Sequence, residues 1–191
     1  CLQQAKSGGD SALVSSNTLY NVMRRDHPAL AAALFDPIAT DRRGDVAIGQ
    51  KSYFEIPVFS WHAQLMSTIY QRQYIDSAQR FDGAMRLTPL HIEALDCFDV
   101  LSNDVRLNFL MRLEAGDMQF VHNHTLLHDR TAFEDWQAPA RKRHLLRLWL
   151  SSPQARPLAP VWAERYGTIE PGVRGGVMVP AASWIAPLEP N

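Results

Sequence analysis

The sequence has few of the features that mark secreted, membrane or nucleic-acid-binding proteins. Its two cysteines, Cys1 and Cys97, cannot build a disulfide framework and are typical of a reducing compartment. No apolar run is long enough to span a bilayer, and the chain does not open with the basic and then apolar segment of a secretory signal. The 19 Lys and Arg residues are matched by 20 Asp and Glu residues, which leaves no basic excess for nucleic acid. We therefore expect a cytoplasmic protein that binds neither membrane nor nucleic acid.

The composition is otherwise that of an ordinary globular protein. With 191 residues, 46% of them hydrophobic, the chain is long enough for one domain, residues 1–191, with a sizeable core. Residues 153–191 are rich in Pro, Gly and Ala without periodicity, so this tail is expected to be loosely structured. The chain opens without an initiator methionine and with a pattern like the middle of a strand, from which we expect an N-terminal truncation.

Local patterns predict a mixture of strands and helices. Two apolar runs, residues 2–5 and 12–15, flank a Gly-Gly turn and predict a hairpin. The clearest helix is expected to begin with Thr88 as its cap and Pro89 at its first position. Further helices are expected at residues 17–25 and 29–35, a second hairpin from residues 54–60 and 65–70, and a strand within residues 105–113.

One stretch, residues 116–151, concentrates the polar and apolar signals. It holds four of the seven histidines and two apolar runs, residues 121–127 and 143–150, that predict buried strands. Because side chains alternate along a strand, Arg143 and Arg147 would share one face of the second run. Arginines on an otherwise apolar face are costly without anionic partners, and a small acid ligand would supply them.

The motifs in this stretch resemble those of a known family. Gly116-Asp117 leads into Asn-His-x-x-Leu-His-x-Arg at residues 123–130, and Arg143-x-x-x-Arg147 follows. This order resembles the C-terminal part of the taurine dioxygenase (TauD/TfdA-like) family. The resemblance implies a mainly β double-stranded β-helix, or jelly roll, with helical insertions and without its N-terminal strands. It also implies an Fe(II)- and 2-oxoglutarate-dependent dioxygenase that uses O2 to oxidise, most often by hydroxylation, a small organic substrate.

The same resemblance implies roles for four residues. His128 corresponds to the distal metal histidine, and Arg143 to the arginine that binds the far carboxylate of 2-oxoglutarate. Arg147 corresponds to a position that often holds an acidic group of the substrate. Gly-Gly-Asp-Ser at residues 8–11 resembles the family's Gly-Gly-Asp-Thr, so Ser11 would help to hold 2-oxoglutarate. Serine keeps the hydroxyl donor of threonine and loses only its methyl group.

The iron chemistry of the family requires two histidines and one carboxylate on one face of the metal. The family supplies two of these ligands from a His-x-Asp or His-x-Glu upstream of the Gly-Gly-Asp turn, where this chain has seven residues and no histidine. The pair His91 and Glu93 does not replace them, because it lies downstream and inside a predicted helix. Residues two apart on a helix do not face each other.

A zinc-like cluster of His122, His124 and His128 is an alternative metal site. No cysteine or carboxylate stands at a matching spacing, so a hydrogen-bonded supporting role for His122 and His124 is favoured.

An alternative function is a non-catalytic jelly-roll binding protein, or a degenerate homologue without iron. The absence of an upstream ligand pair fits this alternative, whereas the joint presence of the four motif residues favours the enzyme. A homo-oligomer is left open. The motif residues are Ser11, His128, Arg143 and Arg147.

Overall fold

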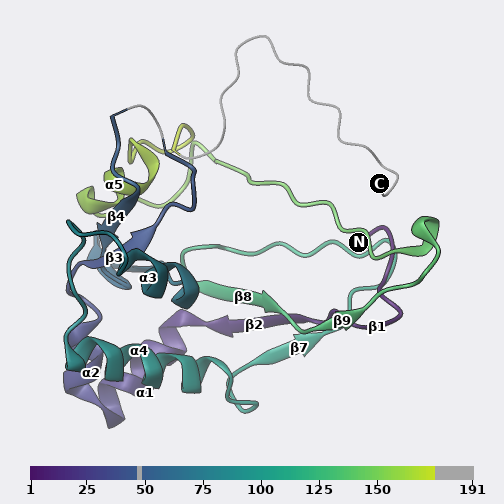
Figure 1. Cartoon of the computed structure of the whole chain (residues 1–191), viewed down its shortest axis with the longest axis horizontal. Coiled ribbons are helices and arrows are strands. Elements are labelled where there is room, and N and C mark those ends of the chain that lie inside the picture. Colours follow the sequence, from purple (N-terminus) through teal and green to yellow (C-terminus); the bar gives the residue numbers. More distant parts are fainter. Residues whose placement is uncertain (47–48, 175–191) are drawn as a thin grey trace.

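The computed structural model describes residues 1–46 and 49–174, in which short strands and helices surround three apolar clusters (Figure 1). The strands are β1 (Ser7–Gly8), β2 (Ser11–Ser15), β3 (Ile38–Asp41), β4 (Tyr53–Ile56), β5 (Phe59–His62), β6 (Leu65–Thr68), β7 (Phe109–Met111), β8 (Leu126–Arg130) and β9 (Phe133–Glu134). The helices are α1 (Ser16–Asp26), α2 (Pro28–Ala33), α3 (Arg72–Ala78), α4 (Pro89–Ser102) and α5 (Ala163–Tyr166), with the 3-10 helices η1 (Pro139–Arg141) and η2 (Pro160–Trp162).

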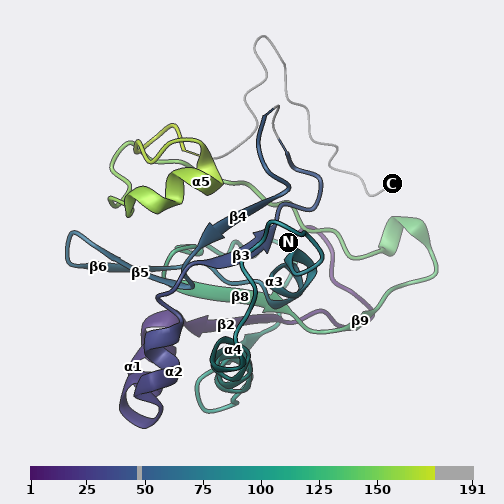
Figure 2. The same ribbon diagram turned by 60° about the vertical axis from the view of Figure 1, so that its left-hand side comes forward.

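The central feature is a three-stranded antiparallel sheet in the order β7-β2-β8. On one face of β2, Val14 is buried and joins a cluster that includes Leu19 of α1 and Phe98 of α4. Leu127 of β8 pairs with Val14 and packs against the same cluster. Helices α1, α2 and α4 lie on this side of the sheet, below it in Figures 1 and 2. The opposite face of β2 and β8 is therefore turned away from the helices.

Two of the helices begin at a capping side chain, Ser15 for α1 and Thr88 for α4. Thr88 Oγ1 accepts a hydrogen bond from the His91 backbone N–H, and His91 Nδ1 accepts one from the Thr88 N–H, both at 3.2 Å. Pro89 occupies the first turn, where its missing N–H costs no hydrogen bond. The expected start of α4 is thus confirmed. The helices expected at 17–25 and 29–35 also form, with Ser15 as the cap of α1.

A second layer covers the strands β3 and β4. Phe54 and Ile56 of β4 are buried together with Leu158 and Trp162, which come from the region around η2 and α5. Residues 153–174, expected to be loose, therefore contribute side chains to a core. The rest of the expected tail, residues 175–191, lies outside the described residues.

One of the two expected hairpins is wrong and the other forms in part. Residues 2–5 do not pair with residues 12–15; instead Gln3 forms an isolated bridge with His144, and β1 pairs with β9. Gly8 and Gly9 turn the chain into β2, whose partners are distant in the sequence. The second hairpin exists as β5 and β6, while the first half of its expected strand forms β4 and pairs with β3.

The two strands expected within residues 116–151 are also corrected. Strand β8 begins at Leu126, so His122 and His124 precede it and lie in a turn. Residues 143–150 do not form a strand; they pair with the rest of the described chain only at His144. An alternating pattern yields a strand only when a partner backbone satisfies its N–H and C=O groups. The apolar side chains of this segment are not buried, since Leu148 is 82% exposed and Leu150 is 79% exposed.

Strands and helices are thus mixed as expected, and a jelly roll is not shown. Within residues 1–46 and 49–174 the strands form one sheet of three strands and three sheets of two, with no closed barrel. In the same residues, each helix falls short of the length and apolarity needed to cross a membrane.

Candidate active site

The pairing of β2 with β8 brings two of the motif residues onto one face of the central sheet. Leu13 pairs with His128, and Ser11 pairs with Arg130. Directly opposed residues, and residues two apart on one strand, point to the same side of a sheet. Ser11 and His128 therefore both lie on the face turned away from α1 and α4. His128 is exposed there, which leaves its imidazole open to a ligand.

Ser11 is oriented by a segment that crosses this face. Its Oγ donates a hydrogen bond to Gln119 Oε1 at 2.8 Å, and Gln119 lies in the irregular stretch between β7 and β8. A hydroxyl can accept hydrogen bonds as well as donate one, so the Ser11 oxygen keeps acceptor capacity. Gln119 was not anticipated from the sequence, where a glutamine between irregular residues carries no periodic signal.

Arg143 lies against the glycine turn that leads into β2. A Cβ atom on Gly9, whose φ is +76°, would stand 3.1 Å from Arg143 Nε, so glycine at this position leaves space for the guanidinium group. The guanidinium carbon lies 5.4 Å from the ring centroid of Phe133, within the range of a cation–π contact. The Arg143 backbone N–H donates to Asp135 Oδ1 at 2.8 Å. These contacts place Arg143 beside the Gly-Gly-Asp-Ser segment, as the motif implied.

Burial and the nearby charge of Arg130 lower the pKa of Arg143, with Asp135 acting in the opposite direction. Among the described residues, no carboxylate lies within ion-pair distance of the Arg143 side chain. An anionic ligand would supply the missing counter-charge.

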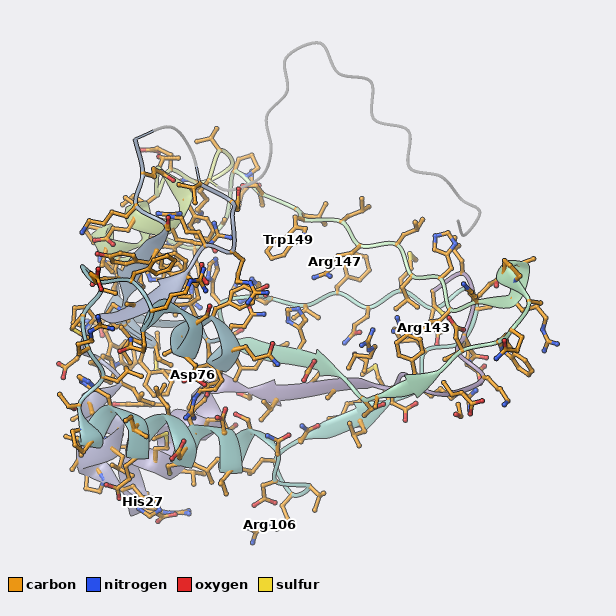
Figure 3. All side chains as sticks on the ribbon, in the orientation of Figure 1. His27, Asp76, Arg106, Arg143, Arg147 and Trp149 are labelled. Atoms are coloured by element: carbon orange, nitrogen blue, oxygen red, sulfur yellow. The ribbon has the colours of Figure 1, made fainter. Side chains whose placement is uncertain are left out.

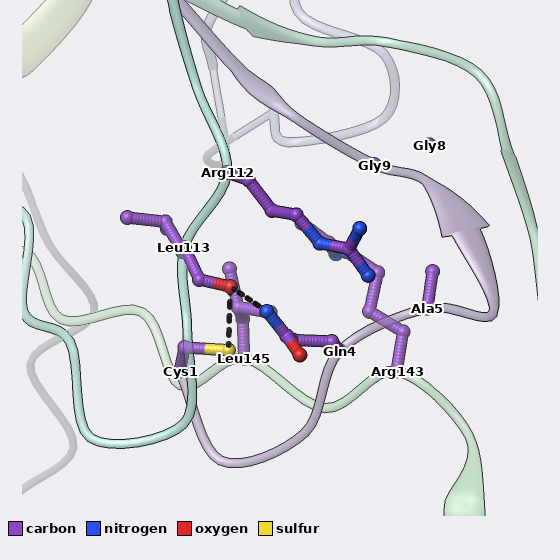
Figure 4. Close-up of a pocket in the computed structure, with 9 residues that line it drawn as sticks. All are labelled: Cys1, Gln4, Ala5, Gly8, Gly9, Arg112, Leu113, Arg143 and Leu145. Atoms are coloured by element: carbon purple, nitrogen blue, oxygen red, sulfur yellow. Dashed lines mark hydrogen bonds between the residues drawn. The ribbon is translucent and has the colours of Figure 1, made fainter.

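Figure 4 shows the cavity on which Arg143 borders. Arg112, Gln4 and Cys1 also line it, and Gln4 Nε2 donates to the Leu113 carbonyl oxygen at 3.0 Å. Its volume is about 10 Å³, which is no more than one water molecule needs. As it stands, this cavity is too small for 2-oxoglutarate.

Arg147 is placed differently from Arg143. Figure 3 shows Arg143 near the Gly9 end of the molecule and Arg147 farther along the extended segment, next to Trp149. Arg147 is exposed, and within the described ranges its side chain makes no hydrogen bond or ion pair that the structure records. The shared strand face that would set Arg147 beside Arg143 does not form.

The residues present do not fit an iron site by themselves. In residues 1–46 and 49–174, no three His, Cys, Asp or Glu side chains come together as a metal-binding group. His128 offers one imidazole, whereas a facial site needs two further ligands.

The zinc-like reading of His122 and His124 is not supported either. The two rings lie 5.8 Å apart, and His124 packs edge-on against Trp162 at 5.1 Å. His91 is buried, with Nε2 3.1 Å from Asp36 Oδ2, which fits its rejection as a metal ligand.

Comparison with known proteins identifies the family. The family model for the taurine catabolism dioxygenase TauD, TfdA family matches residues 1–149. FR-33289 synthase of Streptomyces rubellomurinus is 31% identical over 159 residues, which cover 82% of this chain and 47% of that protein. A uridine-5'-phosphate dioxygenase of an Amycolatopsis species is 29% identical over 160 residues, 81% of this chain and 55% of its own.

A taurine hydroxylase-like protein of Stachybotrys chartarum is 28% identical over 151 residues, 78% of this chain and 38% of its own. The chain therefore spans between 38% and 55% of the length of these three relatives. The family match contains both segments that the β2–β8 pairing joins, the Gly-Gly-Asp-Ser turn and the His-x-Arg strand. This protein belongs to the taurine catabolism dioxygenase TauD, TfdA family.

Proposed function

We propose that this chain is the cosubstrate-binding portion of an Fe(II)- and 2-oxoglutarate-dependent dioxygenase that oxidises a small organic acid. The observation that carries the proposal is the antiparallel pairing of β2 with β8, which sets Ser11 and His128 on the sheet face turned away from the helices. Arg143 stands beside the turn that enters β2. The hydroxyl and the imidazole thus share one face, and the guanidinium group lies at the start of the strand that carries the hydroxyl.

The residues of this chain would bind 2-oxoglutarate through its two charged ends. Arg143 would pair with the far carboxylate by two parallel N–H···O bonds, a geometry that the planar guanidinium favours. Ser11 Oγ would donate to the same ligand in place of Gln119 Oε1, because the hydroxyl has one proton and 2-oxoglutarate offers only acceptors. Opening of the small cavity is required for the Arg143 contact, because its present volume excludes the ligand.

An iron ion held in part by His128 would supply the oxidative chemistry, in which decarboxylation of 2-oxoglutarate drives oxidation of the substrate. His128 supplies one of its three protein ligands in the proposal, and the other two come from outside the described residues, in a protein of the relatives' length. The role assigned to this chain is therefore to bind and orient, and to contribute one imidazole.

The names of two relatives support an acidic substrate. A uridine-5'-phosphate dioxygenase is named for a phosphate-bearing compound, and a taurine hydroxylase-like protein for a sulfonate. Arg147 follows Arg143 by one Arg-x-x-x-Arg interval and is not engaged in a recorded ion pair within the described chain. We assign it the anionic group of the substrate.

Arg143→Ala is expected to weaken 2-oxoglutarate binding by about tenfold or more, because a desolvated carboxylate loses its charged partner. Arg147→Ala is the matched control, since it removes the same charge four residues away and should leave 2-oxoglutarate binding unchanged. Saturation-transfer difference NMR on the 191-residue chain measures both. An unchanged affinity in Arg143→Ala would contradict the assignment.

The second candidate function is a binding protein without iron, which the incomplete ligand set of the described residues favours. Succinate formation from 2-oxoglutarate, with Fe(II) and ascorbate, separates the two functions in a protein of the relatives' length. The dioxygenase forms succinate and loses this activity on His128→Ala. A binding protein forms none, with or without His128.

A further inference from the structure

A second group of cationic and donor side chains lies around η2 and α5, away from the motif residues. Figure 1 places α5 at the opposite end of the molecule from β1, β9 and the chain's N-terminus, and in Figure 2 α5 and β9 again lie on opposite sides. Figure 3, in the orientation of Figure 1, places Arg143 near that N-terminal end. Whatever binds at η2 and α5 is thus distinct from a ligand of Arg143.

Arg174 is the most unusual member of this group. Its side chain is only 8% exposed, although arginine is seldom buried without a counter-charge. One guanidinium nitrogen, Nη2, donates to the backbone carbonyl oxygen of Arg156. A second guanidinium nitrogen, Nη1, is buried and has no hydrogen-bond partner in the described part of the chain. A buried charge without an opposite charge, and with a donor left unused, is strongly destabilising.

Arg156 places a second positive charge near Arg174, where a carboxylate would be expected to neutralise the first. Burial, together with the charge of Arg174, lowers the pKa of Arg156. Neither guanidinium group forms an ion pair with a carboxylate in residues 1–46 and 49–174. Two like charges held near each other repel, and an anion that both contact turns that repulsion into attraction.

Two aromatic residues offer further unused polar atoms. The indole Nε1–H of Trp162 is buried without an acceptor, and indole nitrogen can only donate. Nδ1 of His124 is likewise buried and unpartnered among the described residues, and the two rings meet edge to face at 5.1 Å. Arg174 contacts the Arg156 carbonyl and His124 contacts Trp162, and the charges of Arg174 and Arg156 both lower the pKa of His124. A set dominated by donors selects an acceptor-rich, negatively charged ligand.

We propose that Arg156 and Arg174, with Trp162 and His124, form a binding site for a tetrahedral oxyanion, a phosphate or sulfate group. Such a group carries enough oxygens to accept from two guanidinium ions and an indole N–H at once. Beside these buried atoms, His122 is exposed with its ring 5.8 Å from that of His124, and Arg156 is half-buried, so an anion would approach from this side. Below, this is called the η2–α5 anion site.

The test is a titration of the 191-residue chain with inorganic sulfate, followed by NMR of the Trp162 indole N–H and the His124 ring at pH 6.5. Sodium chloride at matched ionic strength is the reference. Sulfate is expected to shift both signals saturably. Arg156→Gln, which keeps the backbone carbonyl that Arg174 uses, is expected to raise the sulfate concentration at half-saturation about tenfold. Inorganic phosphate and acetate at the same pH show whether the site prefers tetrahedral anions to carboxylates.

Arg165→Gln is the matched control. Arg165 lies on α5 itself, but it has an ionic partner, Asp45 Oδ2 at 3.7 Å, and should leave the sulfate response unchanged. Trp162→Phe assigns the indole N–H signal, because that signal disappears in the variant. It also removes one donor while keeping an aromatic ring. Three outcomes would overturn the proposal: equal shifts with chloride and sulfate, equal half-saturation for wild type and Arg156→Gln, or sulfate shifts that spare His124 and Trp162.

Discussion

At the scale of single residues, His124 shows how packing changes the chemistry of a side chain. Burial, and after it the nearby charges of His122, Arg174 and Arg156, lower its pKa to about 4. Its ring is held between His122 and the stacked pair of Trp162 and Tyr166, where a positive imidazolium ion is disfavoured. His124 is therefore neutral in the folded protein at neutral pH.

The folded protein is expected to lose stability as the pH falls from about 6.5 to about 4, because the unfolded chain then binds a proton that folded His124 does not. Above the unfolded pKa both states are neutral and the stability is fully present. The loss should be roughly 1–2 kcal/mol once solvent access to the ring is allowed for. Urea unfolding of wild type and His124→Gln at several pH values measures it.

His124→Gln should be less dependent on pH across the same range, since glutamine does not titrate. Carboxylates that titrate near pH 4 act in both proteins and cancel in the comparison. Parallel pH profiles for the two proteins would show that His124 does not carry this dependence.

Candidate residues could be named from the sequence only where a motif is local. The roles of Ser11, His128 and Arg143 stay predictions; the structure shows that Ser11 and His128 share one sheet face and that Arg143 lies beside Gly9. The η2–α5 anion site joins His124, Arg156 and Arg174 from three separate segments. No local pattern links them, because their proximity depends on how the chain after residue 150 folds back.

At the scale of elements, α4 shows how much a single capping group contributes. Thr88→Ala is expected to lower the free energy of unfolding by about 1 kcal/mol, because the N–H of the buried His91 loses its acceptor in the first turn of the helix. Thr88→Ser keeps the hydroxyl oxygen and should lose much less. Chemical denaturation compares the three proteins, and equal losses in the two variants would assign the effect to the methyl group instead.

Helices and strands could be predicted from the sequence where the signal is local. The prediction was wrong where an element depends on a partner strand that is distant in the sequence. The Thr-Pro start of α4 lies within one helical turn, and it was predicted correctly. Residues 143–150 alternate as a strand does, yet their hydrogen-bonding groups find no neighbouring strand among the described residues. Register between distant strands, such as β2 and β8, depends on long-range packing that periodicity does not record.

At the scale of the whole molecule, apolar side chains gather on two exposed segments. Met118 and Phe120 are 81% and 78% exposed on the segment before β8, and Leu148 and Leu150 are exposed to a similar extent on the segment after η1. Monomeric soluble proteins rarely leave large contiguous apolar areas in water. We therefore expect the surface that these side chains form to bind apolar molecules and other copies of the chain.

We expect the 191-residue chain to bind the dye 8-anilinonaphthalene-1-sulfonate and to self-associate as its concentration rises. Leu148→Gln with Leu150→Gln should reduce both effects, while the free energy of unfolding stays within about 0.5 kcal/mol, because exposed side chains contribute little to the core. Val100→Gln is the matched control, since Val100 is an exposed apolar residue on α4, outside both segments. Dye fluorescence and light scattering measure the outcome. An equal effect of Val100→Gln would show that dye binding and self-association do not depend on these two segments.

The pairing of β1 with β9 and of β2 with β8 also has a consequence for folding during synthesis on the ribosome. Lys6 meets Glu134, 128 positions later, and Asp10 meets Thr131, 121 positions later, so β1 and β2 acquire their neighbours only after most of the chain has been made. At a synthesis rate of about 5–20 residues per second, β1 and β2 are made on the order of ten seconds before β9 and β8. During that interval the backbone groups of β1 and β2 are unpaired. We expect chaperones that bind extended segments to bind β1 and β2 rather than the locally folded helices α1, α2 and α4.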